Sequence, residues 1–406
     1  MSALVRVFGV HNLALAEDVV QEAFCRAIEV WRFRGIPENP RAWLMVTAKN
    51  CAMDVLRRER TARTFAPELE RYLQSEWTLA PVVDELLASS VIKDDLLRMM
   101  FSCCHPRLPQ ESQIALVLNI LCGFSVDEVA AALLGRHAGI EKRLTRGKKA
   151  LAASQRLFDI NSSVDFAARL PTVQRALYLL FNEGYHGACK QAAIRSELCQ
   201  EAMRLTAILL DHPQGATTET YALAALMCLT AARLPGRADA LGELCSMAEQ
   251  DRSLWDQELI GEGLALLERS ARGQILSEYH IQAAIAGCHA TAADASQTDW
   301  TQIASLYGAL MSLQPSPIVA LNRAIAIAQS EGPDRGLAEI NAIADRERLA
   351  MYPFYHAALG ELQLRGGRST QARRHFEAAV CTARNPMERG FLERRIRACS
   401  EAPALP

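Results

Sequence analysis

The sequence predicts an all-α protein. Apolar residues recur at intervals of three and four along nearly the whole chain, which is the spacing of one face of a helix. Ala, Leu, Glu, Arg and Gln are frequent, and no stretch shows the sustained alternation of β-branched residues that is typical of strands. At 406 residues, half of them hydrophobic, the chain is long enough for about two to four domains and too apolar to be wholly disordered.

The charge and cysteine patterns argue against secretion and membrane insertion. No run of about 18 uncharged apolar residues occurs, so no membrane span is expected. The first residues, MSALVR, lack the basic region, apolar core and small-residue cleavage site of a secretory signal. The 12 cysteines are scattered, and many fall within apolar helical patterns, as buried thiols of a reducing compartment do. We therefore expect a cytoplasmic protein without a disulfide framework.

A small helical unit is predicted at the N-terminus. An amphipathic helix is expected over residues 15–33, and the prolines within 37–40 interrupt its pattern. Its apolar stripe consists of Val19, Val20, Ala23, Phe24, Ala27, Ile28 and Trp31. A second helix over 43–56 leads into an arginine cluster, whose members are Arg57, Arg58, Arg60 and Arg63. Such a cluster is a candidate set of phosphate contacts.

Residues 64–94 differ in character from their neighbours. Acidic side chains outnumber the bases Arg71 and Lys93, and Pro67 and Pro81 interrupt any helical pattern. We expect this segment to be an acidic, partly extended linker.

A helix, a short turn with glycine and a basic second helix are predicted within residues 95–157. Ser125 is placed to cap a helix over 127–134, because acidic residues follow it in the first turn. Gly135 is the expected left-handed end of that helix, and the second helix is expected over 140–153. The bases here are Arg136, Lys142, Arg143, Arg146, Lys148 and Lys149. These are the ingredients of a helix-turn-helix, although other helical hairpins share them.

The packing of this helix pair can also be predicted. Ile140, Leu144 and Leu151 lie on one stripe of the second helix and are expected to contact the first helix. The expected partners are Val129, Ala130 and Leu133. The bases on the other side of the second helix would then be available to a DNA groove.

From residue 158 to 406 the sequence indicates helix pairs joined by short turns. The turns are expected at 210–213, 234–236, 271–273, 315–317, 331–333 and 365–367. A tetratricopeptide (TPR) pattern fits Leu359 and Gly360, followed by Ala372, Phe376 and Ala379. We expect a TPR-like α-solenoid, whose concave surface would bind a peptide or protein.

Three clusters of polar or aromatic residues could be taken for sites, and each has a simpler interpretation. Cys103, Cys104 and His105 have no further ligands at the spacing that zinc requires. Residues 182–186 combine a carboxylate with Tyr and His but lack a nucleophile or phosphate loop, and we interpret them as a polar helix end that anchors the C-terminal segment to the unit before it. Residues 352–356 are expected to lie in the core. We predict no catalytic residue, no metal and no cofactor.

Taken together, these segments resemble the extracytoplasmic-function (ECF) sigma factors of bacterial RNA polymerase. Residues 16–24 (AEDVVQEAF) and 40–58 are similar to conserved region 2 of that family, and residues 108–130 are similar to region 4. The C-terminal half resembles the TPR-containing extension of one ECF subgroup, through residues 181–185, 255–263 and 299–300. The resemblance implies a non-enzymatic factor that directs RNA polymerase to promoters.

The resemblance also divides the chain into four parts. They are an N-terminally short sigma region 2 over 1–63, the acidic linker over 64–94, sigma region 4 over 95–157 and the TPR-like extension over 158–406. The linker would pass near the polymerase active centre. The extension would contact region 2, region 4, the polymerase or another protein, and so take the place of a separate anti-sigma partner.

The resemblance implies three sets of contact residues. Region 2 would hold the polymerase β′ clamp coiled coil through Glu17, Asp18, Gln21 and Phe24. The promoter −10 element would be read by the loop 32–40 together with Asn50, Asp54, Arg57 and Arg58, where an unstacked base of single-stranded DNA is captured. Region 4, beside the β flap, would read the −35 element through Arg136, His137, Gly139, Ile140, Lys142, Arg143 and Arg146.

Two other functions remain open on the sequence. A DNA-binding transcriptional regulator with a TPR-like sensor domain would bind DNA by itself and would not need core polymerase. An enzyme built on residues 160–406 would need a pocket of titratable groups, for which the sequence gives no spacing evidence.

Overall fold

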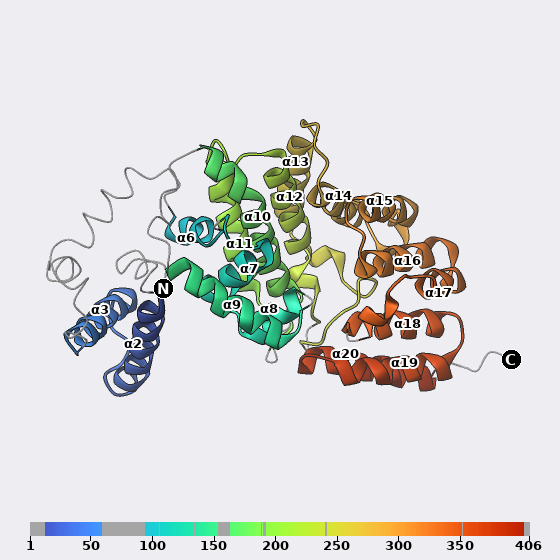
Figure 1. Ribbon diagram of the computed structural model, residues 1–406. Coiled ribbons are helices and arrows are strands. Elements are labelled where there is room, and N and C mark those ends of the chain that lie inside the picture. Colours follow the sequence, from blue (N-terminus) through green and yellow to red (C-terminus); the bar gives the residue numbers. More distant parts are fainter. Residues whose placement is uncertain are drawn as a thin grey trace. The chain divides into compact units, whose positions relative to one another are not determined.

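Helices make up the regular structure of the chain, which confirms the predicted all-α fold class (Figure 1). The computed structural model describes residues 13–58, 94–104, 106–133, 135–152, 163–187, 189, 192–239, 242–350 and 352–401. Within these residues no strand forms, and β pairing is limited to a bridge between Ala238 and Leu244. The predicted acidic linker lies outside the described residues except for Asp94. The chain divides into two units, Met1–Ala176 and Leu177–Pro406, which are described in turn.

The first unit begins with a helix pair and continues with a cluster of shorter helices. Its elements are α2 (Leu13–Arg34), α3 (Pro40–Arg58), α6 (Asp95–Cys103), α7 (Gln110–Leu116), the π-helical turn η2 (Val117–Leu121), α8 (Val126–Ala132) and α9 (His137–Ala152). The helix α10 (Ser163–Tyr185) begins in this unit and ends in the second.

Small side chains let α2 and α3 pack closely. The buried residues of α2 are Ala16, Val19, Ala23 and Ala27, and those of α3 are Ala48, Cys51 and Ala52. Trp31 and Trp43 close one end of the pair, with their ring centroids 5.4 Å apart in an edge-to-face arrangement. Pro40 opens α3, a position where the fixed φ of proline suits the first helical turn. Because alanines fill the contact, the larger apolar side chains of α2 are not needed for it.

A second core joins α6 to α10 with α7 and α9. Phe101 of α6 stacks on Phe166 of α10 at a centroid distance of 4.5 Å. The buried Arg169 side chain donates from Nη1 to the Phe101 carbonyl oxygen at 3.0 Å, so it satisfies a backbone acceptor inside this core. Gly147 of α9 lies against Leu116 of α7, and a Cβ at Gly147 would come within 2.7 Å of the Leu116 side chain. The absence of a side chain at Gly147 therefore sets how closely α9 approaches α7.

A π-helical turn follows α7 directly. The turn η2 holds one more residue than an α-helical turn, and the Cys122 amide closes it by donating to the Val117 carbonyl oxygen. The Asn119 side chain donates to the Phe124 carbonyl oxygen at 2.8 Å and so fixes the segment that comes next. Gly123 adopts a φ of +74°, a conformation that favours glycine, and turns the chain toward α8.

The predicted basic helix pair is present, but its turn is shorter than expected. Ser125 caps α8 through a reciprocal capping box with Glu128, as the sequence predicts. The expectation of a left-handed Gly135 is wrong: Gly135 has no positive φ, and α8 ends earlier, with Leu133 as its C-cap. The second helix, α9, begins at His137 instead of residue 140, because the Arg136 carbonyl oxygen already accepts helical hydrogen bonds.

The second unit is a series of helices joined by short connections. They are α11 (Ser196–Asp211), α12 (Thr218–Ala231), η3 (Leu234–Gly236), η4 (Arg252–Leu254), α13 (Gln257–Ser270), α14 (Glu278–Thr291), η5 (Ala295–Gln297), α15 (Trp300–Leu313), α16 (Pro317–Glu331), α17 (Pro333–Asn341), η6 (Arg346–Leu349), α18 (Pro353–Arg365), α19 (Ser369–Thr382) and α20 (Pro386–Glu401). The turns that the sequence predicts in this unit fall between or at the ends of the α-helices, and the one at 234–236 forms the short helix η3.

Consecutive helices of the second unit pack as pairs. Strong contacts join α12 to α13, α15 to α16, α16 to α17, α18 to α19 and α19 to α20. Glycines allow two of these close approaches: a Cβ at Gly263 of α13 would meet Leu229 of α12, and a Cβ at Gly360 of α18 would meet Phe376 of α19, both at 2.7 Å. The residues of the TPR pattern Ala372, Phe376 and Ala379 form one buried cluster with Leu392 and Cys399 of α20.

Candidate functional site

The helix α2 exposes an apolar stripe that the fold does not use. The stripe consists of Phe24 and Ile28, which are separated by an interval of four and share one face of the helix with Gln21 and Glu17. Phe24 is 53% exposed and Ile28 is 72% exposed. The sequence had placed both on the buried face, but the alanines at 23 and 27 occupy that face instead. Phe33 and Ile36, at and after the end of α2, are also exposed, and such a concentration of exposed apolar residues marks an interaction surface.

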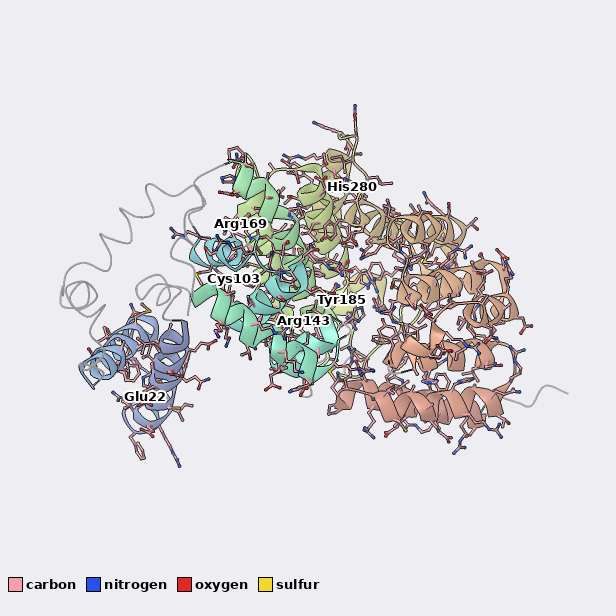
Figure 2. The ribbon with its side chains drawn as sticks, viewed as in Figure 1. Glu22, Cys103, Arg143, Arg169, Tyr185 and His280 are labelled. Atoms are coloured by element: carbon pink, nitrogen blue, oxygen red, sulfur yellow. The ribbon has the colours of Figure 1, made fainter. Side chains whose placement is uncertain are left out.

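The acidic members of the expected polymerase-binding set differ in their surroundings. Asp18 and Gln21 are exposed on α2. Glu17 is partly buried and accepts hydrogen bonds from the Lys148 ammonium at 2.7 and 2.9 Å. On the same helix Glu22, labelled in Figure 2, pairs with Arg26 one helical turn away at 2.9 Å, in a contact that is exposed to solvent. The structure thus presents Asp18, Gln21 and Phe24 to solvent and engages Glu17.

The expected −10 residues occupy one face of α3. Asn50, Asp54, Arg57 and Arg58 are separated by intervals of four, three and one within Pro40–Arg58. Asn50 is exposed, whereas the side chains of the other three lie outside the described residues. The loop expected at 32–40 is shorter in the structure, because α2 continues to Arg34. Arg60 and Arg63 also lie outside the described residues.

The first turn of α9 carries most of the expected −35 residues. Arg136, His137 and Gly139 are exposed where α9 begins, and Lys142 and Arg146 are exposed further along it. The His137 ring lies against α8, with Nδ1 2.7 Å from Asp127 Oδ1. Ile140 is the exception in this set: its side chain is fully buried. Ile140 therefore belongs to the core, and its assignment to the DNA-contact set is corrected here.

Arg143 has an acidic neighbour on α7. Its Nη2 atom lies 2.6 Å from Glu111 Oε2, and both side chains are substantially exposed (Figure 2). An exposed pair of this kind contributes only about 0–1 kcal/mol to stability. The core stripe on the other side of α9 is as predicted, because Ile140, Leu144 and Leu151 are buried together with Val129 of α8.

The three clusters that the sequence analysis did not interpret as sites can be located in the structure. Cys103 and Cys104 are buried at the end of α6, and burial raises the pKa of the Cys103 thiol to about 12, so it stays protonated. Glu183, near the end of α10, pairs with Arg195 of its own unit at 2.7 Å. Phe354, of the 352–356 cluster, contacts Tyr352 and His186 edge-on. Among the described residues no group of three or more His, Cys, Asp or Glu side chains is placed to hold a metal ion.

Sequence reasoning missed a group of arginines in the second unit. Arg233, Arg237 and Arg252 lie against the aromatic rings of Tyr185 and Trp255. The rings that Arg233 and Arg237 contact include Tyr185, which lies up to 52 residues away from them in the sequence, so no local pattern could have found the whole group. Within the part of the chain that the structure describes, no helix is both long enough and apolar enough to cross a membrane.

Comparisons with known proteins match two parts of the chain to families. Residues 2–62 match sigma-70 region 2, which includes α2 and α3. Residues 169–271 match a family of unknown function, DUF6596, which runs from α10 to the end of α13. No solved structure matches the chain.

A relative along the whole chain is found in Rhizobium meliloti (strain 1021). It is described as "Uncharacterized protein R00370", is 39% identical over 406 residues, and is aligned over all of this chain and 94% of its own length. Sigma-70 region 2 is a module of non-enzymatic transcription factors and supports a role in transcription initiation, with core RNA polymerase and promoter DNA as the partners. The chain belongs to the same family as the R. meliloti protein, and its N-terminal helices match region 2 of the sigma-70 family.

Proposed function

We propose that this protein is an ECF-type sigma factor that recognises both promoter elements and carries a fused regulatory domain with a TPR-like fold. The exposed apolar stripe of α2 carries the proposal, because it lies within the sigma-70 region 2 match and the fold itself makes no use of Phe24 and Ile28. A protein surface on core polymerase is a suitable partner for it, and we assign that role to the β′ clamp coiled coil. A cytoplasmic location is part of the proposal.

The DNA contacts follow from the two basic segments. Residues of α3 from Asn50 to Arg58 are assigned to the −10 element. On α9, Arg136 and His137 stand at the helix N-terminus, where a recognition helix meets base edges, and Lys142, Arg143 and Arg146 are assigned to phosphates. The acidic linker 64–94 would run between the two, near the polymerase active centre, and α9 would approach the β flap.

The second unit is proposed to act as a protein-interaction and regulatory domain. Its paired helices, the close approach of α18 and α19 at Gly360, and the buried cluster around Phe376 support a TPR-like assignment. Such stacked pairs present extended surfaces to a partner.

Binding to core polymerase tests the proposal. We expect the purified protein to bind core RNA polymerase and to support promoter-dependent transcription. The double substitution Phe24→Ala and Ile28→Ala should weaken core binding at least tenfold without lowering the unfolding temperature appreciably. Val164→Ala, at an exposed apolar residue of α10, is the matched control and should bind as the unaltered protein does. A protein that fails to bind core polymerase at all would refute the proposal.

A DNA-binding regulator is the second candidate, favoured by the exposed bases at the start of α9. Footprinting of the protein without polymerase separates the two functions. A sequence-specific footprint by the protein alone would support the regulator, whereas a footprint that requires core polymerase supports the sigma factor. In either case Arg143→Gln should weaken DNA binding, and Glu111→Gln, which removes its acidic neighbour, should not.

A further inference from the structure

Three arginines of the second unit gather around two aromatic rings. Tyr185, labelled in Figure 2, lies at the C-terminal end of α10. The Arg237 guanidinium lies 4.2 Å from the centroid of its ring. Arg233 lies between two rings, 5.9 Å from the Tyr185 centroid and 5.5 Å from that of Trp255. Arg252 contacts the Trp255 ring at 4.8 Å. We call these five residues the arginine–aromatic cluster.

The guanidinium groups of this cluster form no close ion pair among the described residues, and the carboxylate that acts on Arg252, that of Asp294, does so from more than 4.0 Å away. Arg252 donates to the carbonyl oxygens of His289 and Ala292 and to the Thr298 hydroxyl. Arg237 is buried and donates to the Tyr185 carbonyl oxygen. Among the described residues no Asp or Glu lies within 4.0 Å of the Arg233, Arg237 or Arg252 guanidinium, whereas many arginines elsewhere in this unit form such ion pairs. Arg237 is buried, and Arg233 and Arg252 are partly buried. A buried guanidinium group without a close counter-charge is costly, so its retention calls for an explanation.

Buried polar atoms at the cluster also lack hydrogen-bond partners. They are Arg233 Nε and Trp255 Nε1, together with Nδ1 of His289, the residue whose carbonyl oxygen accepts from Arg252. Trp255 is 3% exposed and His289 is 8% exposed. Native proteins leave few buried polar groups unsatisfied, and those that remain commonly mark an ordered water or a bound ion. Gly236 packs closely against the indole, because a Cβ there would come within 3.0 Å of Trp255 Nε1.

The neighbouring histidine does not add to the charge. Burial, together with repulsion by Arg233 and Arg252, lowers the pKa of His289 to about 3, so this imidazole is neutral at physiological pH. Burial and the proximity of Arg233 also lower the pKa of Arg237. The donors at the cluster are therefore fixed N–H groups of arginine and tryptophan, surrounded by aromatic rings.

We propose that the arginine–aromatic cluster binds an oxyanion, the carboxylate or phosphate group of a small-molecule ligand. An oxyanion would supply the missing counter-charge and would accept hydrogen bonds from Arg233 Nε and Trp255 Nε1. Guanidinium groups suit this role, because their planar donors match the oxygens of carboxylates and phosphates. The site would make the second unit a sensor of a small anion, which goes beyond the proposed function and does not depend on it.

Titration of the full-length protein with simple anions tests the inference. Inorganic phosphate and succinate are used in separate arms, with chloride at equal ionic strength as the reference. We expect at least one of the two anions to bind with 1:1 stoichiometry in calorimetry and to raise the unfolding temperature relative to chloride. A response to phosphate alone identifies a phosphorylated ligand, a response to succinate alone identifies a carboxylate ligand, and a response to both identifies a general oxyanion site.

Substitutions of Arg233 locate the site. Arg233→Gln should weaken anion binding at least tenfold, and Arg233→Lys, which keeps the charge but loses the planar donors, should weaken it less. Arg374→Gln, at an exposed arginine of α19, is the matched control and should leave binding unchanged. If Arg233→Gln does not fold, the calorimetry of the unaltered protein and of Arg233→Lys still decides.

Two results would overturn the inference. One is the absence of any difference between chloride and the two oxyanions, which would mean that water and ring stacking alone satisfy the cluster. The other is undiminished binding in Arg233→Gln, which would place the anion elsewhere. Since the titration contains neither polymerase nor DNA, its failure leaves the proposed function intact, and a failure of polymerase binding leaves the anion site intact.

Discussion

The helices α2 and α12 use their apolar residues in opposite ways. In α2 the contact with α3 is made of small residues, and the larger Phe24 and Ile28 face solvent. In α12 apolar residues surround the helix and nearly all of them are buried, because α11, α13 and α14 pack around it. The difference teaches that the apolar residues of α12 stabilise the fold, whereas those of α2 are available to another molecule.

Truncation of one apolar side chain in each helix tests this comparison. Leu229→Ala in α12 removes a fully buried side chain that lies against Gly263, so we expect a loss of about 2–5 kcal/mol in the free energy of unfolding. Phe24→Ala in α2 should change it by less than about 0.5 kcal/mol. Urea unfolding followed by circular dichroism measures both. Equal losses in the two variants would show that Phe24 serves the fold after all.

Acidification should destabilise the second unit, because the buried side chain of His289 lies in it. Its pKa of about 3 in the folded protein is below the ordinary value of 6.5, so the unfolded chain binds the proton more readily. The contribution of the neutral His289 side chain to the free energy of unfolding is complete above pH 6.5 and is lost as the pH falls toward 3. Between pH 6.5 and 5 the loss should reach about 2 kcal/mol.

The variant His289→Gln isolates this contribution from other titrating groups. Its free energy of unfolding should depend less on pH between 6.5 and 5 than that of the unaltered protein, as measured by urea unfolding at a series of pH values. Identical pH dependence in the two proteins would contradict the burial of a neutral imidazole at this position.

A comparison within one helix is possible in α9, which has both an enclosed and an exposed face. Gly147→Val would place a side chain against Leu116 and should destabilise the protein by about 1–3 kcal/mol. Gly139→Ala, with no atom within 4 Å of the new Cβ, should instead stabilise the helix by up to about 1 kcal/mol. Thermal unfolding of the two variants tests this pair. A destabilised Gly139→Ala would show that the first turn of α9 is packed more tightly than the structure indicates.

Local signals in the sequence predicted much of the fold. Proline at 40, 317, 333 and 386 opens a helix, and the Ser125 capping box starts α8 where expected. The start of α9 was misplaced because glycine at 139 looks like part of a turn, whereas the Arg136 carbonyl and the His137–Asp127 contact already fix helical geometry. Helical spacing alone could not decide which stripe of α2 is buried, since that depends on the small residues of α3.

The candidate sites were predictable to different extents. The bases of α9 follow from the sequence because they are neighbours in the chain, although Ile140 was assigned to DNA and lies in the core. The arginine–aromatic cluster could not be predicted, because Tyr185, Arg233 and Trp255 meet only through tertiary packing. Which of its nitrogen atoms lack a hydrogen-bond partner depends on the three-dimensional structure and cannot be predicted from a pattern of residue types.

The π-helical turn η2 has a consequence for everything that follows it. An α-helix advances about 100° per residue, so the extra residue within Val117–Leu121 rotates the exit direction of the chain by roughly that angle. Deletion of a single amino acid there would reset the helical phase and swing the capped α8 out of line with α7. The direction of the basic helix α9 therefore depends on a turn some twenty positions earlier in the chain, whose residues are not among those assigned to DNA.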